Sequence, residues 1–160
     1  MDAISGSGRI TPFLWFNDNA EEAADFYVSV FKNSRRLDGL KSSTETSVPK
    51  GKTLVVGFEL DGQRFTALNG GPAHTFNEAV SFVIRCEDQA EVDYYWEKLT
   101  ADGGSEIQCG WLKDKFGLRW QVVPAQMAEL LKKPGAMQAM MRMKKLDIAE
   151  LQRAGAEQVS

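Results

Sequence analysis

The chain contains the same stretch of structure twice, and this repeat constrains its fold more than any other feature. Residues 13–22, FLWFNDNAEE, align with residues 82–91, FVIRCEDQAE, at an offset of 69 residues, and Tyr27 falls on Trp96 at the same offset. Each copy reads as a strand and a helix followed by a hairpin, which predicts two β-α-β-β-β modules. One module cannot cover its own sheet. We therefore predict an α+β fold whose paired modules form a curved mixed sheet around a cup-like cavity.

The first module is predicted over residues 9–78. Residues 9–16 have the composition of a strand, and Asn19 can cap the helix that follows by accepting a hydrogen bond from a free backbone N–H. Residues 37–40 predict a short strand only weakly. Residues 53–60 and 64–68 flank Asp61-Gly62, which is a strong signal for a two-residue hairpin turn.

The second module is predicted over residues 79–124. Residues 79–85 indicate a strand, and residues 89–100 indicate a helix with Asp88 as its cap. Residues 114–117 are turn formers, and residues 118–123 are rich in β-branched and aromatic side chains. The module is therefore expected to end in a hairpin whose last strand closes the sheet.

The last predicted strand carries the first candidate for a binding residue. Alternate side chains of a strand share a face, which groups Leu118, Trp120 and Val122 against Arg119, Gln121 and Val123. Whichever face packs into the core, Trp120 or Gln121 lies on the opposite surface. If that surface is concave, Gln121 is a binding residue.

The two ends of the chain differ from the modules. Residues 1–8 are rich in Ser and Gly and indicate a flexible lead. Residues 125–160 predict a helical tail, with helices over 125–131 and 136–154 and a break at Pro134-Gly135. The methionines of this tail lie near helical spacing, which favours a packing stripe against the body of the protein or a second subunit. We expect one structural domain overall.

Composition excludes several classes of function. A chain of 160 residues with 43% hydrophobic residues can bury a sizeable core, and a net charge of -3 argues against a nucleic-acid-binding surface. No apolar run approaches the roughly 20 residues that cross a bilayer, and no signal segment is recognisable. Cys86 and Cys109 have no CxxC spacing, which fits a reducing compartment and thiols without a disulfide. We expect a cytoplasmic protein that binds neither nucleic acid nor membrane.

Several of these segments together resemble a known family. They are Asn19 with Phe26-Tyr27 in the first helix, and the stretches FLWF at 13–16, LNGGP at 68–72 and CGWLKDKFG at 109–117. These residues are similar to those of the vicinal oxygen chelate superfamily, which includes glyoxalase, bleomycin-resistance and extradiol-dioxygenase proteins. More narrowly, they resemble its PhnB-like branch, which is also labelled 3-demethylubiquinone-9 3-methyltransferase-like. The resemblance implies the paired-module fold and a cup that holds a small molecule.

Metal-dependent members of that superfamily bind a divalent ion through His or Glu side chains from both modules. The resemblance carries these positions onto Pro12, Ser81, Gln121 and either Ala67 or Asn69. Proline has no ligating side chain, and a serine hydroxyl or a neutral amide is a poor ligand for a transition metal. We therefore expect no metal and no cofactor.

The resemblance and the aromatic residues together suggest a ligand site. The candidate residues are Trp15, Asn69, His74, Trp111, Trp120 and Gln121. Large aromatics that face a cavity supply apolar contact area, although core packing is an equal alternative for each Trp, and His74 can also be an exposed loop residue.

Three functions remain open from the sequence. The first is a metal-independent protein that binds an apolar or aromatic small molecule and sequesters it rather than transforming it; we also expect a homodimer. The second is an enzyme of the same superfamily, either a metal-dependent lyase, isomerase or dioxygenase, or a methyltransferase as the family label suggests. A common methyltransferase needs a glycine-rich turn after the first strand of a parallel sheet, and Gly70-Gly71 does not provide it. The third is an interaction protein that uses its methionine-bearing tail.

Overall fold

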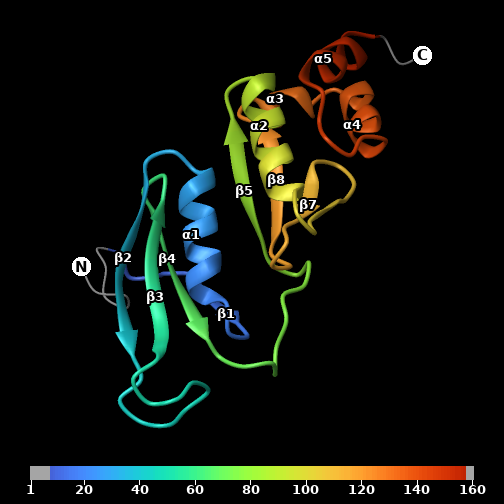
Figure 1. Cartoon of the computed structure of the whole chain (residues 1–160). Helices are drawn as coiled ribbons and strands as arrows, with labels where there is room; N and C mark the ends of the chain where they lie inside the picture. The colour runs from blue at the N-terminus through green and yellow to red at the C-terminus, as the bar shows by residue number, and fades with distance from the viewer. Residues whose placement is uncertain (1–7, 158–160) are drawn as a thin grey trace. The chain divides into compact units, whose positions relative to one another are not determined.

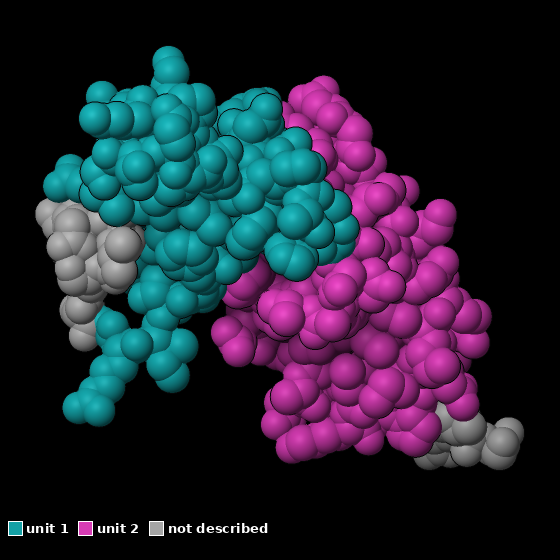
Figure 2. Space-filling view, turned by 90° about the horizontal axis from the view of Figure 1, so that it is seen from below, with its two compact units in different colours: residues 1–76 teal, residues 77–160 magenta. Residues whose placement is uncertain are grey.

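The computed structural model describes residues 8–157, so the expected flexible lead lies outside the described residues except for Gly8. The chain divides into two compact units, one ending at Phe76 and the other beginning at Asn77, which Figure 2 shows in different colours. Within the described residues each unit contains a four-stranded sheet with parallel and antiparallel pairs. The α+β fold class is confirmed, and each unit is described by itself below.

The first unit packs one long helix along its sheet (Figure 1). Its elements are β1 (Phe13–Phe16), α1 (Ala20–Val30), β2 (Ser34–Lys41), β3 (Thr53–Leu60) and β4 (Gln63–Asn69), and the strand order is β1-β4-β3-β2. The hairpin at Asp61-Gly62 is confirmed. Both residues have positive φ angles, 46° and 85°, as a two-residue turn with the twist of the flanking strands requires.

The core of the first unit lies between α1 and one face of the sheet. Tyr27 is fully buried, its ring contacts Phe58, and Phe58 stacks on Phe65 across the β3–β4 pair. Asn19 is the N-cap residue as predicted, but its side chain makes no capping hydrogen bond. The Ala20 N–H donates instead to Oδ1 of Asn69 at 2.9 Å.

The second unit repeats this plan. Its elements are β5 (Ser81–Cys86), α2 (Gln89–Thr100), β6 (Ser105–Glu106), β7 (Trp111–Lys113) and β8 (Arg119–Pro124), with the strand order β5-β8-β7-β6. The predicted bounds of α2 are confirmed, and Oδ1 of Asp88 accepts the Glu91 N–H at 2.9 Å as the expected cap.

A buried carboxylate organises the hairpin before β8. Asp114 is 1% exposed; its Oδ1 accepts the N–H groups of Phe116 and Leu118, and its Oδ2 accepts Nε1–H of Trp120 at 2.8 Å. Leu118, Trp120 and Val122 are all buried. The core therefore takes the Trp120 face of the last strand, and Gln121 lies on the other.

The tail differs from its prediction in one respect. Its helices are α3 (Met127–Leu130), α4 (Pro134–Met141) and α5 (Ile148–Ala156). The single helix predicted over 136–154 is wrong, because the chain leaves helical geometry at 142–147 and Asp147 caps a new helix by accepting the Glu150 N–H. Pro134 begins α4, where its missing N–H costs no helical hydrogen bond. No helix in the described part of the chain is long and apolar enough to span a membrane.

The two modules are also related differently from the constant offset of 69. In β1, Phe16 lies on the face that α1 covers, beside its register partner Asn69. In β5, the covered face carries the buried residues Ile84 and Cys86, and Val83 is exposed on the other face. Phe16 therefore corresponds to Cys86, at an offset of 70, while the caps Asn19 and Asp88 keep the offset of 69. The first module has one extra residue between strand and helix. An offset of 69 within the strands is wrong, because a one-residue slip puts every side chain on the opposite face.

Candidate functional site

Each sheet has one face covered by its helix and one face turned away from it. We call the second kind the outer face. On the outer face of the second unit, strand register places side chains from β5, β8 and β7 in rows. The first row is Ser81, Arg119 and Lys113, the second is Val83, Gln121 and Trp111, and the third contains Arg85 and Val123.

Gln121 lies at the centre of this face. It is the register partner of Val83 on one side and of Trp111 on the other. Its Nε2 donates a hydrogen bond of 2.9 Å to Oγ of Ser81 in the neighbouring row. The structure thus brings two predicted site residues, Gln121 and Trp111, side by side and holds the amide in a defined orientation.

Arg119 borders Gln121 along β8. Its side chain is 15% exposed, Nη1 donates to the Gly117 carbonyl oxygen at 2.6 Å, and Nη2 donates to Oε2 of Glu78 at 3.1 Å. Lys113 is its register partner on β7. The outer face of the second unit therefore combines an aromatic ring, a fixed amide and cationic groups.

Trp15 forms a second aromatic feature, in the first unit. Its Nε1 donates to the Gly71 carbonyl oxygen at 2.9 Å, and the His74 ring meets the indole edge-on with 4.8 Å between centroids. The indole lies so close to Gly70 that a Cβ at this glycine would be 2.6 Å from Cδ2 of the ring. The structure brings the predicted residues Trp15 and His74 together, with His74 exposed.

The remaining two predicted residues lie on the helix side of their sheets. Trp120 is 3% exposed and bonded to Asp114. Asn69 is 5% exposed; besides accepting from Ala20, its Nδ2 donates to the Thr53 carbonyl oxygen at 3.0 Å. The structure gives both side chains packing and hydrogen-bonding roles, and the proposal below is built on the other four.

The positions carried over for metal ligands change with the corrected register. At the strand offset of 70, Ser81 corresponds to Thr11 and not to Pro12. Ala67 is the partner of helix-facing Leu14, so neither Ala67 nor Asn69 points to the outer face. In the first sheet the counterpart of Gln121 is Thr66, which pairs with Phe13 as well as Gly57.

These side chains do not fit a transition-metal site. Hydroxyl and amide groups replace the imidazole and carboxylate ligands that such ions require. Within residues 8–157 no group of three or more His, Cys, Asp or Glu side chains is placed to hold a metal ion.

Comparison with known protein families identifies the family of this chain. A family model described as 3-demethylubiquinone-9 3-methyltransferase matches residues 8–123, which span both modules up to the end of β8. The chain belongs to this family. This family is the PhnB-like branch of the vicinal oxygen chelate superfamily, which the sequence resemblance predicted.

Solved structures support the same assignment. The PhnB protein from Bacillus cereus is 30% identical, with a TM-score of 0.65 over 72% of this chain and 99% of its own. A protein from Pseudomonas aeruginosa is 23% identical, with a TM-score of 0.59 over 74% and 98%. The fosfomycin resistance protein FosX from Mesorhizobium loti shares the fold at 15% identity, with a TM-score of 0.56 over 81% and 100%. No curated protein sequence matches the chain.

Sequence reasoning missed the cations of the outer face in this family member. Strand alternation groups Arg119 with Gln121, but Arg85 and Lys113 lie on other strands, and their place beside Gln121 depends on strand pairing. The signal that could have found them is the same alternation applied to β5 and β7.

The Cys86 thiol is unsuited to nucleophilic chemistry. Cys86 and Cys109 are both free thiols. Burial, together with the nearby carboxylates of Glu91 and Asp88, raises the pKa of the Cys86 thiol to about 12. A thiol with such a pKa stays protonated at neutral pH and is a poor nucleophile.

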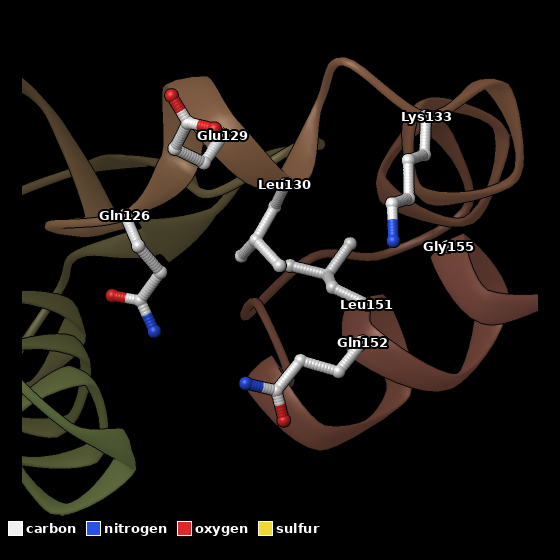
Figure 3. A pocket seen from close by; sticks show the side chains of 7 residues that line it. All are labelled: Gln126, Glu129, Leu130, Lys133, Leu151, Gln152 and Gly155. Atoms are coloured by element: carbon white, nitrogen blue, oxygen red, sulfur yellow. The ribbon is translucent and has the colours of Figure 1, made fainter.

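A separate pocket lies in the helical tail (Figure 3), with a volume of about 320 Å³. Its lining residues are Gln126, Glu129, Leu130, Lys133, Leu151, Gln152 and Gly155. Leu130 and Leu151 point toward each other as an apolar floor, and the polar side chains stand around them. The charges at its rim have both signs, so this pocket favours no ligand class.

Replacing Gly70 with Ala tests how Trp15 is held. The added methyl group overlaps the indole and must displace it, so we expect a changed Trp15 fluorescence and a loss of stability of about 1–3 kcal/mol. Gly8→Ala is the control, because its Cβ meets nothing closer than 3.8 Å. Fluorescence spectra and urea unfolding of both variants give the answer. Unchanged spectra and stability in Gly70→Ala would contradict the described packing.

Proposed function

We propose that this chain is a metal-independent small-molecule-binding protein whose ligand is apolar or aromatic and is sequestered rather than transformed. The ligand lies on the outer face of the second unit, against Trp111 and Gln121. Trp15 and His74 offer a separate aromatic platform on the first unit. The observation that carries the proposal is the neutral amide of Gln121, held by Ser81 and placed beside an aromatic ring.

The chemistry of these groups supports binding. An indole ring supplies a large apolar contact area at little conformational cost. A side-chain amide fixed by one hydrogen bond keeps its remaining capacity for a ligand, and a few such polar groups within an apolar site give orientation. Neither group can transfer protons near neutral pH or retain a divalent ion, which supports holding a molecule over catalysis.

The description of the family suggests a methyltransferase as a second candidate. The mixed strand order argues against it, because β1 runs parallel to β4 but the remaining pairs of that sheet are antiparallel. The common methyltransferases bind their nucleotide-like cofactor on a parallel sheet. Calorimetric titration with S-adenosylmethionine separates the two functions: we expect no binding, and stoichiometric binding would favour the methyltransferase.

A ligand screen tests the proposed function. The full-length protein, dialysed against EDTA, is screened by thermal shift with small aromatic and aliphatic compounds of different charge. We expect some compounds to raise the Tm and to lose at least about tenfold in affinity in Trp111→Ala, since tryptophan is enriched among the few contact residues whose truncation costs about 2 kcal/mol or more. Met141→Ala, exposed on α4, is the control and should bind as the original chain does. Hits that bind Trp111→Ala unchanged, or only after a divalent metal is added, would overturn the proposal.

The cellular setting is part of the same proposal. Two free thiols without a disulfide suit the cytoplasm. We also propose that the protein is a homodimer, since a sheet edge such as β1 or β5 pairs readily with another chain. A molar mass of one chain, measured by light scattering, would contradict the proposed homodimer.

A further inference from the structure

The outer face of the second unit also indicates the charge of its ligand. We propose that it binds an amphipathic organic anion, whose carboxylate or phosphate group lies at Arg119 and Lys113 and whose apolar part lies across Val83, Gln121 and Trp111. This inference rests on the proposed function and specifies its ligand class. It follows from the positions and charges of the side chains in the three rows.

Cations flank the central row on both sides. Arg119 and Lys113 are register partners in the first row, and Arg85 stands in the third. Among the charged groups next to these rows, Glu78 pairs with Arg119. The face therefore carries three positive groups and one negative group beside Gln121, although the whole chain has a net charge of -3.

The first unit shows that this charge is not a property of the fold. Arg64 occupies the place that corresponds to Arg119, but its register partner on β3 is Glu59, where the second unit has Lys113. Glu59 also pairs with Arg35 at 3.0 Å. The same two positions thus carry opposite charges in one module and two positive charges in the other.

The pair between Arg119 and Glu78 shows that a carboxylate can dock at this guanidinium. Nη2 of Arg119 donates to Oε2 of Glu78 at 3.1 Å. The Glu78 side chain is 73% exposed and lies in the turn before β5, so this carboxylate can turn away into water. A ligand anion can therefore take its place. A planar guanidinium with a lysine beside it suits both carboxylate and phosphate oxygens.

The central row supplies the apolar part of the site. Val83 is 44% exposed, so its apolar side chain is open to contact on the outer face. Trp111 lies on the other side of Gln121 in the same row. A flat apolar group that lies along this row brings an attached acidic group within one row of Arg119, because adjacent rows on a face are two residues, or about 7 Å, apart.

Four probes that share one ring system test this inference. They are 2-naphthoate, 2-naphthyl phosphate, 2-naphthamide and 2-naphthylmethylamine, titrated into the full-length protein and followed by calorimetry at low and high salt. We expect at least one anion to bind about tenfold or more tighter than the amide and to weaken with salt, and the amine to bind weakest. Comparing the carboxylate with the phosphate shows which acidic group is preferred.

Variants localise the effect. Arg119→Gln and Lys113→Gln should each weaken the anion by about tenfold while leaving the affinity for 2-naphthamide unchanged, and Arg119→Lys should restore part of the loss. Lys132→Gln, a change of the same charge on the exposed tail, is the control. Lys113→Gln removes a positive charge from β7 and leaves β8 unchanged. It therefore still tests the inference if Arg119→Gln fails to fold.

The outcomes separate this inference from the proposed function. If the amide binds as tightly as both anions, or if neither Gln variant weakens the anion, the charge assignment is overturned. In that case a loss of amide binding in Trp111→Ala still supports the proposed function. If every probe binds Trp111→Ala as it binds the original chain, the proposed function fails as well.

Discussion

Replacing Asp114 with alanine is expected to lower the free energy of unfolding by about 3–5 kcal/mol, because it leaves buried donors without their acceptor. The carboxylate accepts from Phe116, Leu118 and Trp120, and it is 1% exposed. The last hairpin then loses the bonds that hold its turn and the Trp120 ring. Urea unfolding followed by tryptophan fluorescence measures the loss.

Asp114→Asn is the matched variant. An asparagine keeps one acceptor oxygen for the turn, but its NH₂ group faces Nε1–H of Trp120, which is also a donor. We expect it to lose about half as much stability as Asp114→Ala. A loss below about 1 kcal/mol in Asp114→Ala would show that this network does not stabilise the hairpin.

Two glycines where α4 meets α5 should respond to alanine in opposite directions. A Cβ at Gly135 would overlap the carbonyl oxygen of Ala154 and lie 3.0 Å from its carbonyl carbon, and a backbone group cannot turn aside as a side chain can. We expect Gly135→Ala to lower the free energy of unfolding by about 2 kcal/mol or more, despite the helix-favouring substitution.

Gly155→Ala is the control at the same helix crossing. Its Cβ would meet Cδ of Lys133 at 3.3 Å, the middle of a flexible side chain on the exposed rim of the tail pocket. We expect a gain in stability of up to about 1 kcal/mol, because alanine favours the helix. Thermal and urea unfolding of both variants decide the matter. A change of the same sign and size in both would contradict the close approach at Gly135.

Local signals predicted the elements near the site well. Asp61-Gly62 specifies its hairpin because both residues tolerate positive φ angles, and Asp88 specifies the start of α2 because its carboxylate caps the next free N–H. Strand alternation separated Gln121 from Trp120 before the core was known. Each of these inferences depends on residues close together in the sequence.

The features that the sequence did not reveal depend on distant contacts. The first helix is capped by Asn69, which lies 49 residues from its partner Ala20 along the chain. The strand offset of 70 requires knowing which side of β5 meets α2, and a single extra turn residue hides it in an alignment. The split between α4 and α5 arises at 142–147, where no glycine or proline interrupts the helical pattern.

The same limit applies to the candidate site. Trp111 and Gln121 were each predicted, but their contact is a matter of β7–β8 register. Arg85 becomes a neighbour of the site only because β5 pairs with β8, which lies far from it in the sequence, and Lys113 only through the register of the β7–β8 hairpin. Register, rather than composition, therefore determines the chemistry of the outer face.

The metal content of ligand-competent protein tests the central claim most directly. Protein purified without chelator is analysed by plasma mass spectrometry for Zn, Ni, Mn and Fe, and the same sample is titrated with a compound selected by the thermal-shift screen. We predict metal well below one ion per chain together with full ligand binding, since the outer faces offer amide, hydroxyl and indole groups. One tightly held ion per chain, whose removal by EDTA abolishes ligand binding, would contradict the account.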